Sequence, residues 1–259
     1  SMTDNNHKDP EKSSTERIAK RIASAGVCSR RDAEKLIEQG KVAVNGRIIQ
    51  SPALNVLPED VIAINGQVIN KKEDNIRIFV YHKPAGLVTT HKDERGRPTV
   101  FDTLPENLPR LISVGRLDLN SEGLLLLTND GGISRVLEHP ASQLRREYRV
   151  RIFGDVTQDD LNALKNGVNV QGVQYGPIEA KIQSDKGRNK WLLVAIYEGK
   201  NREIRKIMES LGLKVNRLIR VAYGPFELGA IEKGAVKEIT DPKIKTYLKG
   251  LVKNFGAKQ

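Results

Sequence analysis

The sequence predicts an α+β protein: a small N-terminal αα-hairpin module, then a larger domain on a mostly antiparallel mixed sheet with flanking helices. Two patterns predict this. Two helix-period stretches with short hairpin signals occupy residues 15–69. From residue 76 onward, strand patterns outnumber helix patterns and often follow one another directly. The 259 residues suffice for one large and one small domain.

Charge and composition favour a polyanionic partner. Lysine and arginine number 43 against 32 acidic residues, a net charge of +11, which suits nucleic acid or an anionic membrane surface. No apolar stretch approaches the ~18 residues of a membrane span. No signal-peptide pattern opens the chain, so we expect a cytoplasmic protein. One cysteine, Cys28, excludes an intramolecular disulfide, and four histidines without metal-ligand spacing indicate no metal.

Two short helices open the N-terminal module. Ile18 and Ile22 lie on one helical stripe, and Gly26 ends it because glycine adopts the left-handed conformation at low cost. Ser29–Gln39 predicts the second helix, because Ser29 and Asp32 have the spacing of a capping box.

Two hairpins complete the module. Asn45-Gly46 lies within KVAVNGRII and Asn65-Gly66 within VIAINGQVI, and each pair suits a type I′ turn. The flanking segments are polar and lack apolar periodicity, which predicts a disordered tail and a linker. The expected division is a disordered tail at 1–14, the module at 15–69, a linker at 70–75, the larger domain at 76–250 and a loose tail at 251–259.

The larger domain mixes strands and helices. Asp130 is a suitable N-cap for a helix that Pro140 stops. Thr157 and Asp160 form a capping box for a helix that ends at Gly167. The expected helices are 132–139, 157–167 and 201–212, and the expected strands are 76–83, 124–127, 146–153, 191–199 and 215–224.

The stretch VGRLDLNSEGLLLLTNDG, residues 114–131, places Asp118 in a tight polar turn before four leucines. Residues 124–127 predict a buried strand that would hold this turn still. A partly desolvated aspartate needs a cationic partner to stay ionised, and Arg116 and Arg205 are the candidates. An ordinary turn aspartate with a structural ion pair is the alternative.

Lys83 and Tyr148 are further candidates. Lys83 ends a strand at a Pro-Ala-Gly turn, which can present it to a substrate phosphate, and a plain hairpin turn is the alternative that this motif alone favours. Tyr148 shares a strand face with Val150, and such an aromatic can stack on an unpaired base. A tyrosine of the core is the alternative reading.

Two basic clusters can contact RNA. Arg30, Arg31 and Lys35 share a helix whose other face is apolar, and this basic face can lie along a phosphate backbone. A basic face that is only hydrated is the alternative. Lys200, Asn201 and Arg202 form a strand-to-helix turn, where helix-terminal amides also favour anions.

Several motifs together resemble the pseudouridine synthases, specifically the RsuA branch that modifies ribosomal RNA. GRLDLNSEGLLLLTNDG resembles the central motif of that family, and YHKPAG, REYRV and EGKNREIRKIM resemble its flanking motifs in the expected order. Residues 15–70 resemble an S4-type RNA-binding domain. The resemblance spans about residues 15–250.

The resemblance implies a role for each candidate. Asp118 would be the catalytic carboxylate, and Arg205 would hold it ionised and oriented. Tyr148 would stack on the flipped base and help to move the C5 proton. Arg116 would contact the RNA backbone or fill the space that the base leaves, and Lys83 would support the site. The reaction is an isomerisation without net redox change, so no cofactor is expected.

The resemblance also implies the partner. The motifs fit the large-subunit members of the branch, which implies 23S rRNA or a pre-ribosomal particle as substrate and a monomeric enzyme. A 16S rRNA substrate and a non-catalytic, RNA-binding ribosome-assembly factor stay open. A hydrolase using Asp118 and Glu122 as a carboxylate pair is a further alternative.

Overall fold

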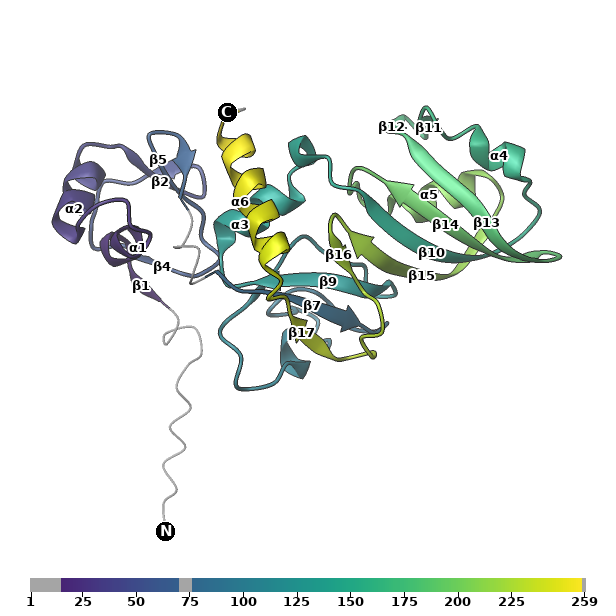
Figure 1. Ribbon diagram of the computed structural model, residues 1–259, viewed down its shortest axis with the longest axis horizontal. Coiled ribbons are helices and arrows are strands. Elements are labelled where there is room, and N and C mark those ends of the chain that lie inside the picture. Colours follow the sequence, from purple (N-terminus) through teal and green to yellow (C-terminus); the bar gives the residue numbers. More distant parts are fainter. Residues whose placement is uncertain (1–14, 70–75, 258–259) are drawn as a thin grey trace, which may run out of the picture.

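The computed structural model describes residues 15–69 and 76–257 (Figure 1). The expected disordered tail at 1–14 and linker at 70–75 lie outside the described residues, as do residues 258–259. No helix among the described residues is long and apolar enough to cross a membrane.

The N-terminal module packs two helices on short antiparallel strands. A four-stranded sheet has the order β3-β2-β5-β6, and β1 pairs with β4. Its core contains the predicted stripe residues Ile18 and Ile22 from the first helix and Ile37 from the second. In chain order the elements are β1 (Glu16–Arg17), α1 (Ile18–Ser24), α2 (Arg30–Glu38), β2 (Val42–Val44), β3 (Arg47–Ile48), β4 (Asn55–Val56), β5 (Ile62–Ile64) and β6 (Gln67–Val68).

Local signals in this module are confirmed. Ser29 caps α2, because its Oγ accepts a hydrogen bond from the Asp32 N–H at 3.1 Å. Asn45 has a φ of 51° and Gly46 a φ of 83°, the positive pair that a type I′ turn requires. The second Asn-Gly pair repeats this geometry with φ values of 51° and 80°.

The larger region is built on a nine-stranded sheet, and the α+β prediction is confirmed. The central order is β13-β14-β10-β15-β9-β7-β17, with β16 beside β15 and β8 beside β9. Its elements are β7 (Ile78–Lys83), η3 (Phe101–Thr103), β8 (Ile112–Ser113), β9 (Glu122–Thr128), α3 (Gly131–Glu138), η4 (Pro140–Ser142), β10 (Arg146–Phe153), α4 (Gln158–Asn162), β11 (Val168–Val170), β12 (Val173–Tyr175), β13 (Ile178–Lys186), β14 (Asn189–Ile196), α5 (Glu203–Ser210), β15 (Lys214–Tyr223), β16 (Phe226–Glu227), β17 (Val236–Glu238) and α6 (Pro242–Ala257).

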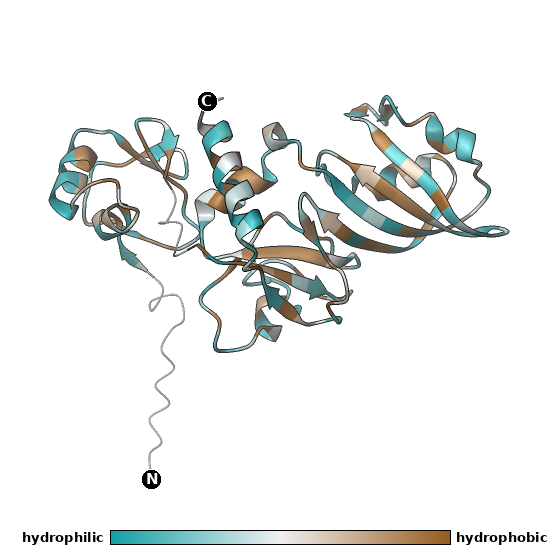
Figure 2. Cartoon of the chain, in the orientation of Figure 1, coloured by the Kyte–Doolittle hydropathy of each residue, from teal (hydrophilic) through white to brown (hydrophobic). Residues whose placement is uncertain are grey.

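The leucine run forms the buried strand β9, as predicted, and Figure 2 shows it as a continuous hydrophobic stretch. Leu124 and Leu126 point into a cluster that includes residues of α3 and α6. Leu125 and Leu127 point into a second cluster on the opposite face. Both faces of β9 are therefore covered, which explains a continuous rather than an alternating apolar pattern.

The two halves of the sheet meet at a short seam. In the described part of the chain, β15 and β9 make the single parallel pairing of this sheet, with Ile219 opposite Glu122 and Arg220 opposite Gly123. Gly123 has a φ of 103°, and a Cβ there would overlap the Arg220 carbonyl oxygen and lie 2.8 Å from the Arg220 nitrogen. The seam therefore requires glycine at this position.

Two helix expectations are corrected. The helix predicted over 157–167 is α-helical only at Gln158–Asn162, although its capping box of Thr157 and Asp160 is present. The loose tail predicted at 251–259 is wrong up to Ala257, because α6 continues through these residues. Its buried residues Leu248 and Phe255 lie seven positions apart on one helix face, and the Phe255 ring packs edge-on against His139.

The module contacts the larger region directly. Arg110 donates to both carboxylate oxygens of Glu59, the closer contact at 2.9 Å. The backbone of Glu59 also lies against the first residue of α3, Gly131, where an added Cβ would come within 2.8 Å of the Glu59 carbonyl oxygen. Glu59 therefore links the N-terminal module both to Arg110 and to the start of α3.

The seam geometry generates a stability prediction. Gly123→Ala adds both a left-handed strain and a backbone clash, so we expect a loss of more than about 3 kcal/mol in the free energy of unfolding. Gly172→Ala is the control, because Gly172 has a φ of 85° with no atom within 4 Å of an added Cβ. It should cost only about 1–2 kcal/mol. Urea titrations measure both, and equal losses would contradict the clash.

Candidate active site

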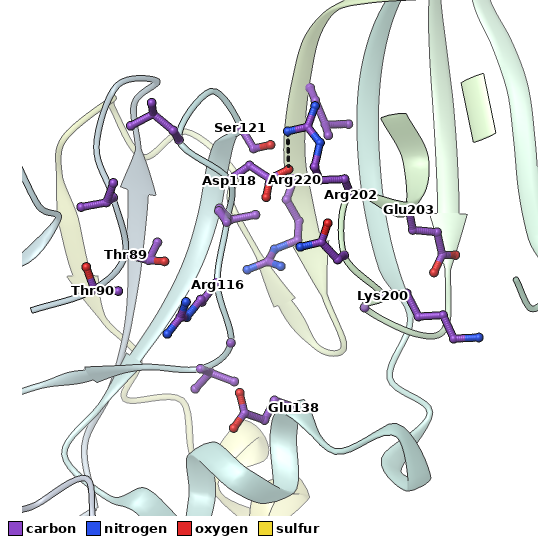
Figure 3. Close-up of a pocket in the computed structure, with 18 of the residues that line it drawn as sticks. Thr89, Thr90, Arg116, Asp118, Ser121, Glu138, Lys200, Arg202, Glu203 and Arg220 are labelled. Atoms are coloured by element: carbon purple, nitrogen blue, oxygen red, sulfur yellow. Dashed lines mark ion pairs between the residues drawn. The ribbon is translucent and has the colours of Figure 1, made fainter. Parts of the chain in front are cut away.

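A cleft of about 990 Å³ opens between the two halves of the sheet. Figure 3 shows Asp118 and Ser121 on one wall and Lys200, Arg202 and Glu203 on the other. The first wall comes from the loop before β9, and the second comes from the turn between β14 and α5. The cleft is therefore assembled from segments about 80 residues apart in the chain.

Asp118 lies in a pinned turn with its carboxylate open to the cleft. Its backbone carbonyl accepts from the Ser121 N–H at 3.0 Å, and the next carbonyl, of Leu119, accepts from the Gly86 N–H at 2.8 Å. The side chain keeps 34% of its surface exposed. The turn is thus held by backbone bonds while the carboxylate stays available to a ligand.

Lys83 lies beneath this turn. Its ammonium donates to the carbonyls of Pro84, Leu119 and Ser121 at 3.1, 3.1 and 2.7 Å. The residue is 0% exposed, so the expectation that it contacts an RNA phosphate is wrong. Burial lowers the pKa of Lys83 to about 8, although the negative charges of Glu122 and Asp118 act to raise it. Lys83 therefore braces the Asp118 turn from within.

Two arginines of the opposite wall face Asp118. Arg202 Nη1 lies 3.6 Å and Arg205 Nε 3.8 Å from Asp118 Oδ2. The sequence predicted Arg205 as a partner and missed Arg202, while Arg116 lies apart from the pair marked in Figure 3. Both distances exceed a hydrogen bond, so these cations stabilise the charge of Asp118 without saturating its oxygens.

Arg205 is a half-buried cation. Its Nη2 lies 3.3 Å from Ser121 Oγ, and its side chain is mostly covered. Burial and the neighbouring charge of Arg202 lower the pKa of Arg205, while Asp118 and Glu209 oppose that shift. The Asp118 carboxylate therefore compensates a cation that is costly to bury.

The turn before α5 carries the remaining predicted cations. Arg202 has a φ of 50°, so the chain reverses sharply there and brings its guanidinium toward Asp118. Lys200 donates to the Gln174 carbonyl at 2.5 Å, and its ammonium lies 3.4 Å from Glu198. Arg202, Lys200 and Asn201 are all exposed and line the cleft.

Tyr148 lines the cleft from β10 and is 8% exposed. Burial alternates along β10 as predicted, with Val150 on the Tyr148 side. Arg220 stands opposite Tyr148 on β15, donates to the Leu124 carbonyl at 2.8 Å and lies over the Tyr223 ring. Nothing in the sequence indicated that Arg220 is buried beside Tyr148, because its partners lie far away in the chain.

Glu122 is committed to structural pairing. It receives two hydrogen bonds from Arg217, at 2.8 and 3.0 Å, and Lys233 lies 3.0 Å away. Burial opposes its ionisation, but the bonds from Arg217 and Lys233 outweigh burial and lower the pKa of Glu122. Because its charge is already paired with Arg217 and Lys233, Glu122 gives no support to a hydrolase that uses Asp118 and Glu122 as a carboxylate pair.

Other predicted residues lie outside this cleft. Arg30, Arg31 and Lys35 are exposed on α2 of the module, while Ala33 and Ile37 of the same helix are buried. The basic face therefore forms as expected, but the structure does not bring it into the cleft. In the described ranges, no group of three or more His, Cys, Asp or Glu side chains could hold a metal ion.

Two further features of the cleft were missed from the sequence. The segment at 92–97 contributes Lys92, Arg95 and Arg97 to the lining, and it lacks a regular periodic pattern. Glu203 is a buried acid on the wall. Its place four residues before Ile207, on the apolar stripe of the helix, was a readable signal.

Comparisons with known proteins agree with this geometry. Residues 77–210 match the family model described as RNA pseudouridylate synthase, and residues 16–62 match the S4 domain. The chain is 48% identical over 242 residues to an uncharacterized RNA pseudouridine synthase of Rickettsia typhi, covering 92% of this chain and 98% of that protein.

Two further relatives extend the comparison. Identity is 41% over 244 residues to the ribosomal large subunit pseudouridine synthase B of Salmonella typhimurium, covering 92% of this chain and 84% of that protein. A crystal structure of a pseudouridylate synthase matches with a TM-score of 0.62 and 28% identity, covering 91% of this chain and 99% of that one. The chain therefore belongs to the RNA pseudouridylate synthase family, with an S4 domain ahead of its synthase region.

Proposed function

We propose that this RNA pseudouridine synthase isomerises a uridine of 23S rRNA and that Asp118 is its catalytic carboxylate. The observation that carries the assignment is the placement of Asp118: a partly exposed carboxylate on a braced turn, with Arg202 and Arg205 within 4 Å. The large-subunit substrate is supported by the 41% identity to a large-subunit synthase B.

The reaction breaks the glycosidic C–N bond, turns the uracil and joins it to the ribose through carbon. Atoms balance within the uridine, since the C5 proton leaves and N1 gains one. Attack on the base, attack on the ribose and elimination each need an ionised carboxylate at the sugar–base junction. Arg202 and Arg205 place two positive charges within 4 Å of the Asp118 carboxylate.

Neighbouring side chains supply the other roles in this proposal. A uridine must leave its stack to enter the cleft, and Tyr148 offers a ring there for stacking and for transfer of the C5 proton. Arg205 acts as a positioning residue because it reaches both Ser121 and the Asp118 carboxylate. Arg116, at the cleft edge, and Lys200, Asn201 and Arg202, on the opposite wall, contact RNA.

The N-terminal module adds affinity. We assign residues 15–69 as the S4-type RNA-binding domain and the region from residue 76 as the catalytic domain, which α6 extends to Ala257. Arg30, Arg31 and Lys35 of α2 face solvent and contact phosphates. The proposed enzyme acts in the cytoplasm as a monomer.

The catalytic assignment gives one prediction. Asp118→Asn removes the charge but keeps the shape, so product formation should fall by at least about 10³-fold while RNA affinity changes less than about threefold. Pseudouridine is mapped in 23S and 16S rRNA from cells that lack the gene, after complementation with wild type or Asp118→Asn.

Each mapping outcome has a defined meaning. One 23S site that wild type restores and Asp118→Asn does not restore supports the proposal. A restored 16S site would contradict the substrate assignment, and no restored site would favour an assembly factor. Normal turnover by Asp118→Asn would contradict the catalytic role.

The module gives a second prediction. Replacing Arg30, Arg31 and Lys35 by glutamine removes three phosphate contacts, so the slope of log affinity against log salt should fall by about 2–3. The rate at saturating RNA should stay unchanged. The charge-matched control replaces Lys165, Lys243 and Lys253, which are exposed outside the cleft, and an equal slope change in that control would contradict a specific role for α2.

A further inference from the structure

Among the described residues, one face of the sheet half β13-β14-β10-β15 is exposed along β13 and β10, while Trp191 of β14 and Ile219 of β15 on that face pack against the cluster of Leu124 and Leu126. Helices α4 and α5 pack on its other face, where Val150 and Leu192 join residues of both helices in one core. Side chains alternate along β10, so Arg149 and Arg151 point to the face without helices and are exposed. Figure 2 shows the corresponding hydrophilic bands along β10.

Cations outnumber acids on this face, where Arg145 pairs with both Glu147 and Glu179. Lys181 and Arg149 both stand opposite Leu193 of β14, and Arg151 stands directly opposite Arg217 of β15. Like charges at opposed positions of an antiparallel pair destabilise a sheet. Glu122 neutralises Arg217, but the described residues offer Arg149, Arg151 and Lys181 no ion pair.

Aromatic rings lie between these cations. The Arg149 guanidinium lies 4.5 Å from the Trp191 ring centroid, and the Arg188 guanidinium lies 4.7 Å from that of Phe153. Phe153 is 38% exposed, so part of its ring faces solvent beside the Arg188 guanidinium. Guanidinium planes and aromatic rings both stack on unpaired bases.

We propose that this surface, named the β10 outer face and defined by Arg149, Arg151, Lys181, Trp191 and Phe153, binds a single-stranded or looped segment of RNA. The inference rests on the proposed function, because that segment belongs to the RNA that carries the target uridine. Phosphates neutralise the unpaired cations, and bases stack on the arginine–aromatic pairs. Because Tyr148 points the other way from β10, this surface is separate from the catalytic cleft.

The test uses the full chain with Arg149, Arg151 and Lys181 replaced by glutamine. Filter binding to a full-length 23S rRNA transcript, from about 50 to about 200 mM salt, should show about tenfold weaker affinity and a salt slope smaller by about 2. KM should rise by a similar factor, and the rate at saturating RNA should stay unchanged. The Lys165, Lys243 and Lys253 variant is the charge-matched control.

The outcomes separate this inference from its premise. Unchanged binding, equal weakening in the control or a lower rate at saturating RNA would overturn the β10 outer face as an RNA site. Retained RNA binding with lost binding to vesicles rich in phosphatidylserine would assign the face to membranes and overturn it too. If the wild-type enzyme forms no pseudouridine, the proposed function is refuted. The filter-binding comparison needs no turnover, so it tests the β10 outer face separately.

An independent observation concerns Glu203, which is 3% exposed at the start of α5. Both of its carboxyl oxygens are buried, and neither makes a hydrogen bond of ordinary geometry among the described residues. Its neighbour is the carboxylate of Glu198, which accepts from the Gly176 N–H at 2.7 Å and lies 3.4 Å from the Lys200 ammonium. Two ionised carboxylates there would repel each other across the base of the turn that carries Arg202.

We infer that Glu203 is a positioning residue that stays neutral and donates a hydrogen bond to Glu198, which holds the turn closed. Burial, then the charge of Glu198, raises the pKa of Glu203 to about 8, while the backbone N–H and the charge of Lys200 act against the shift. Arg146 on β10 and Tyr175 on β12 also lie beside this turn. As pH rises through that value the pair becomes doubly charged, and Arg202 loses its place beside Asp118.

Glu203→Gln mimics the neutral acid. Wild type should lose kcat as pH rises from about 7 to about 9 with a limb near 8, and Glu203→Gln should keep full activity at pH 7 and lack that limb. Glu198→Gln should also lack it, because an amide can donate to the Glu203 carboxylate. Glu209→Gln, an exposed acid on the same helix, is the control and should keep it.

A limb that persists in Glu203→Gln would assign it to another group, such as Lys83, and overturn the inference. Loss of activity at pH 7 in Glu203→Gln would do so as well. These experiments compare the pH profiles of variants on the same RNA, so their outcome does not depend on which rRNA is the natural substrate.

Discussion

The parallel contact between β9 and β15 is the constraint on which the rest of the molecule depends. Only two residues of each strand pair there, and Gly123 lets the backbones approach without a Cβ between them. One half of the sheet carries the Asp118 turn, and the other carries Tyr148 and the arginines of α5. Because the halves join over so short a length, their edges diverge and leave a cleft open to a large substrate.

Charge in the cleft follows one physical logic. A basic protein attracts RNA, and in our proposal its cleft also holds the catalytic carboxylate of Asp118. Arg202 and Arg205 lie close enough to stabilise the charge of Asp118 and too far to bind its oxygens tightly. Glu122, by contrast, is ion-paired with Arg217 and Lys233. Of two acids four residues apart, one therefore stabilises the fold and the other faces the cleft.

Strand β10 serves two faces of the enzyme. Its inward side chains, Tyr148 among them, line the cleft and the core, whereas Arg149 and Arg151 face outward. The period of two makes this division unavoidable once one face is buried. The cationic outer row thus extends RNA contact beyond the cleft in our proposal, at the expense of an unfavourable Arg151–Arg217 pairing within the sheet.

Local chemistry in the sequence by itself determined the strands that border the cleft, the helix caps, the Asn-Gly turns and the buried leucine strand that positions Asp118, since each depends on residues a few positions apart. Only the tertiary structure decided which charges meet. Lys83 is sealed beneath the turn by carbonyls 36 and 38 residues away, and Arg205 reaches Ser121 over 84 residues. The helix continuing to Ala257 also depends on packing of its apolar side. Side-chain partners that distant leave no periodic trace, because folding rather than spacing brings them together.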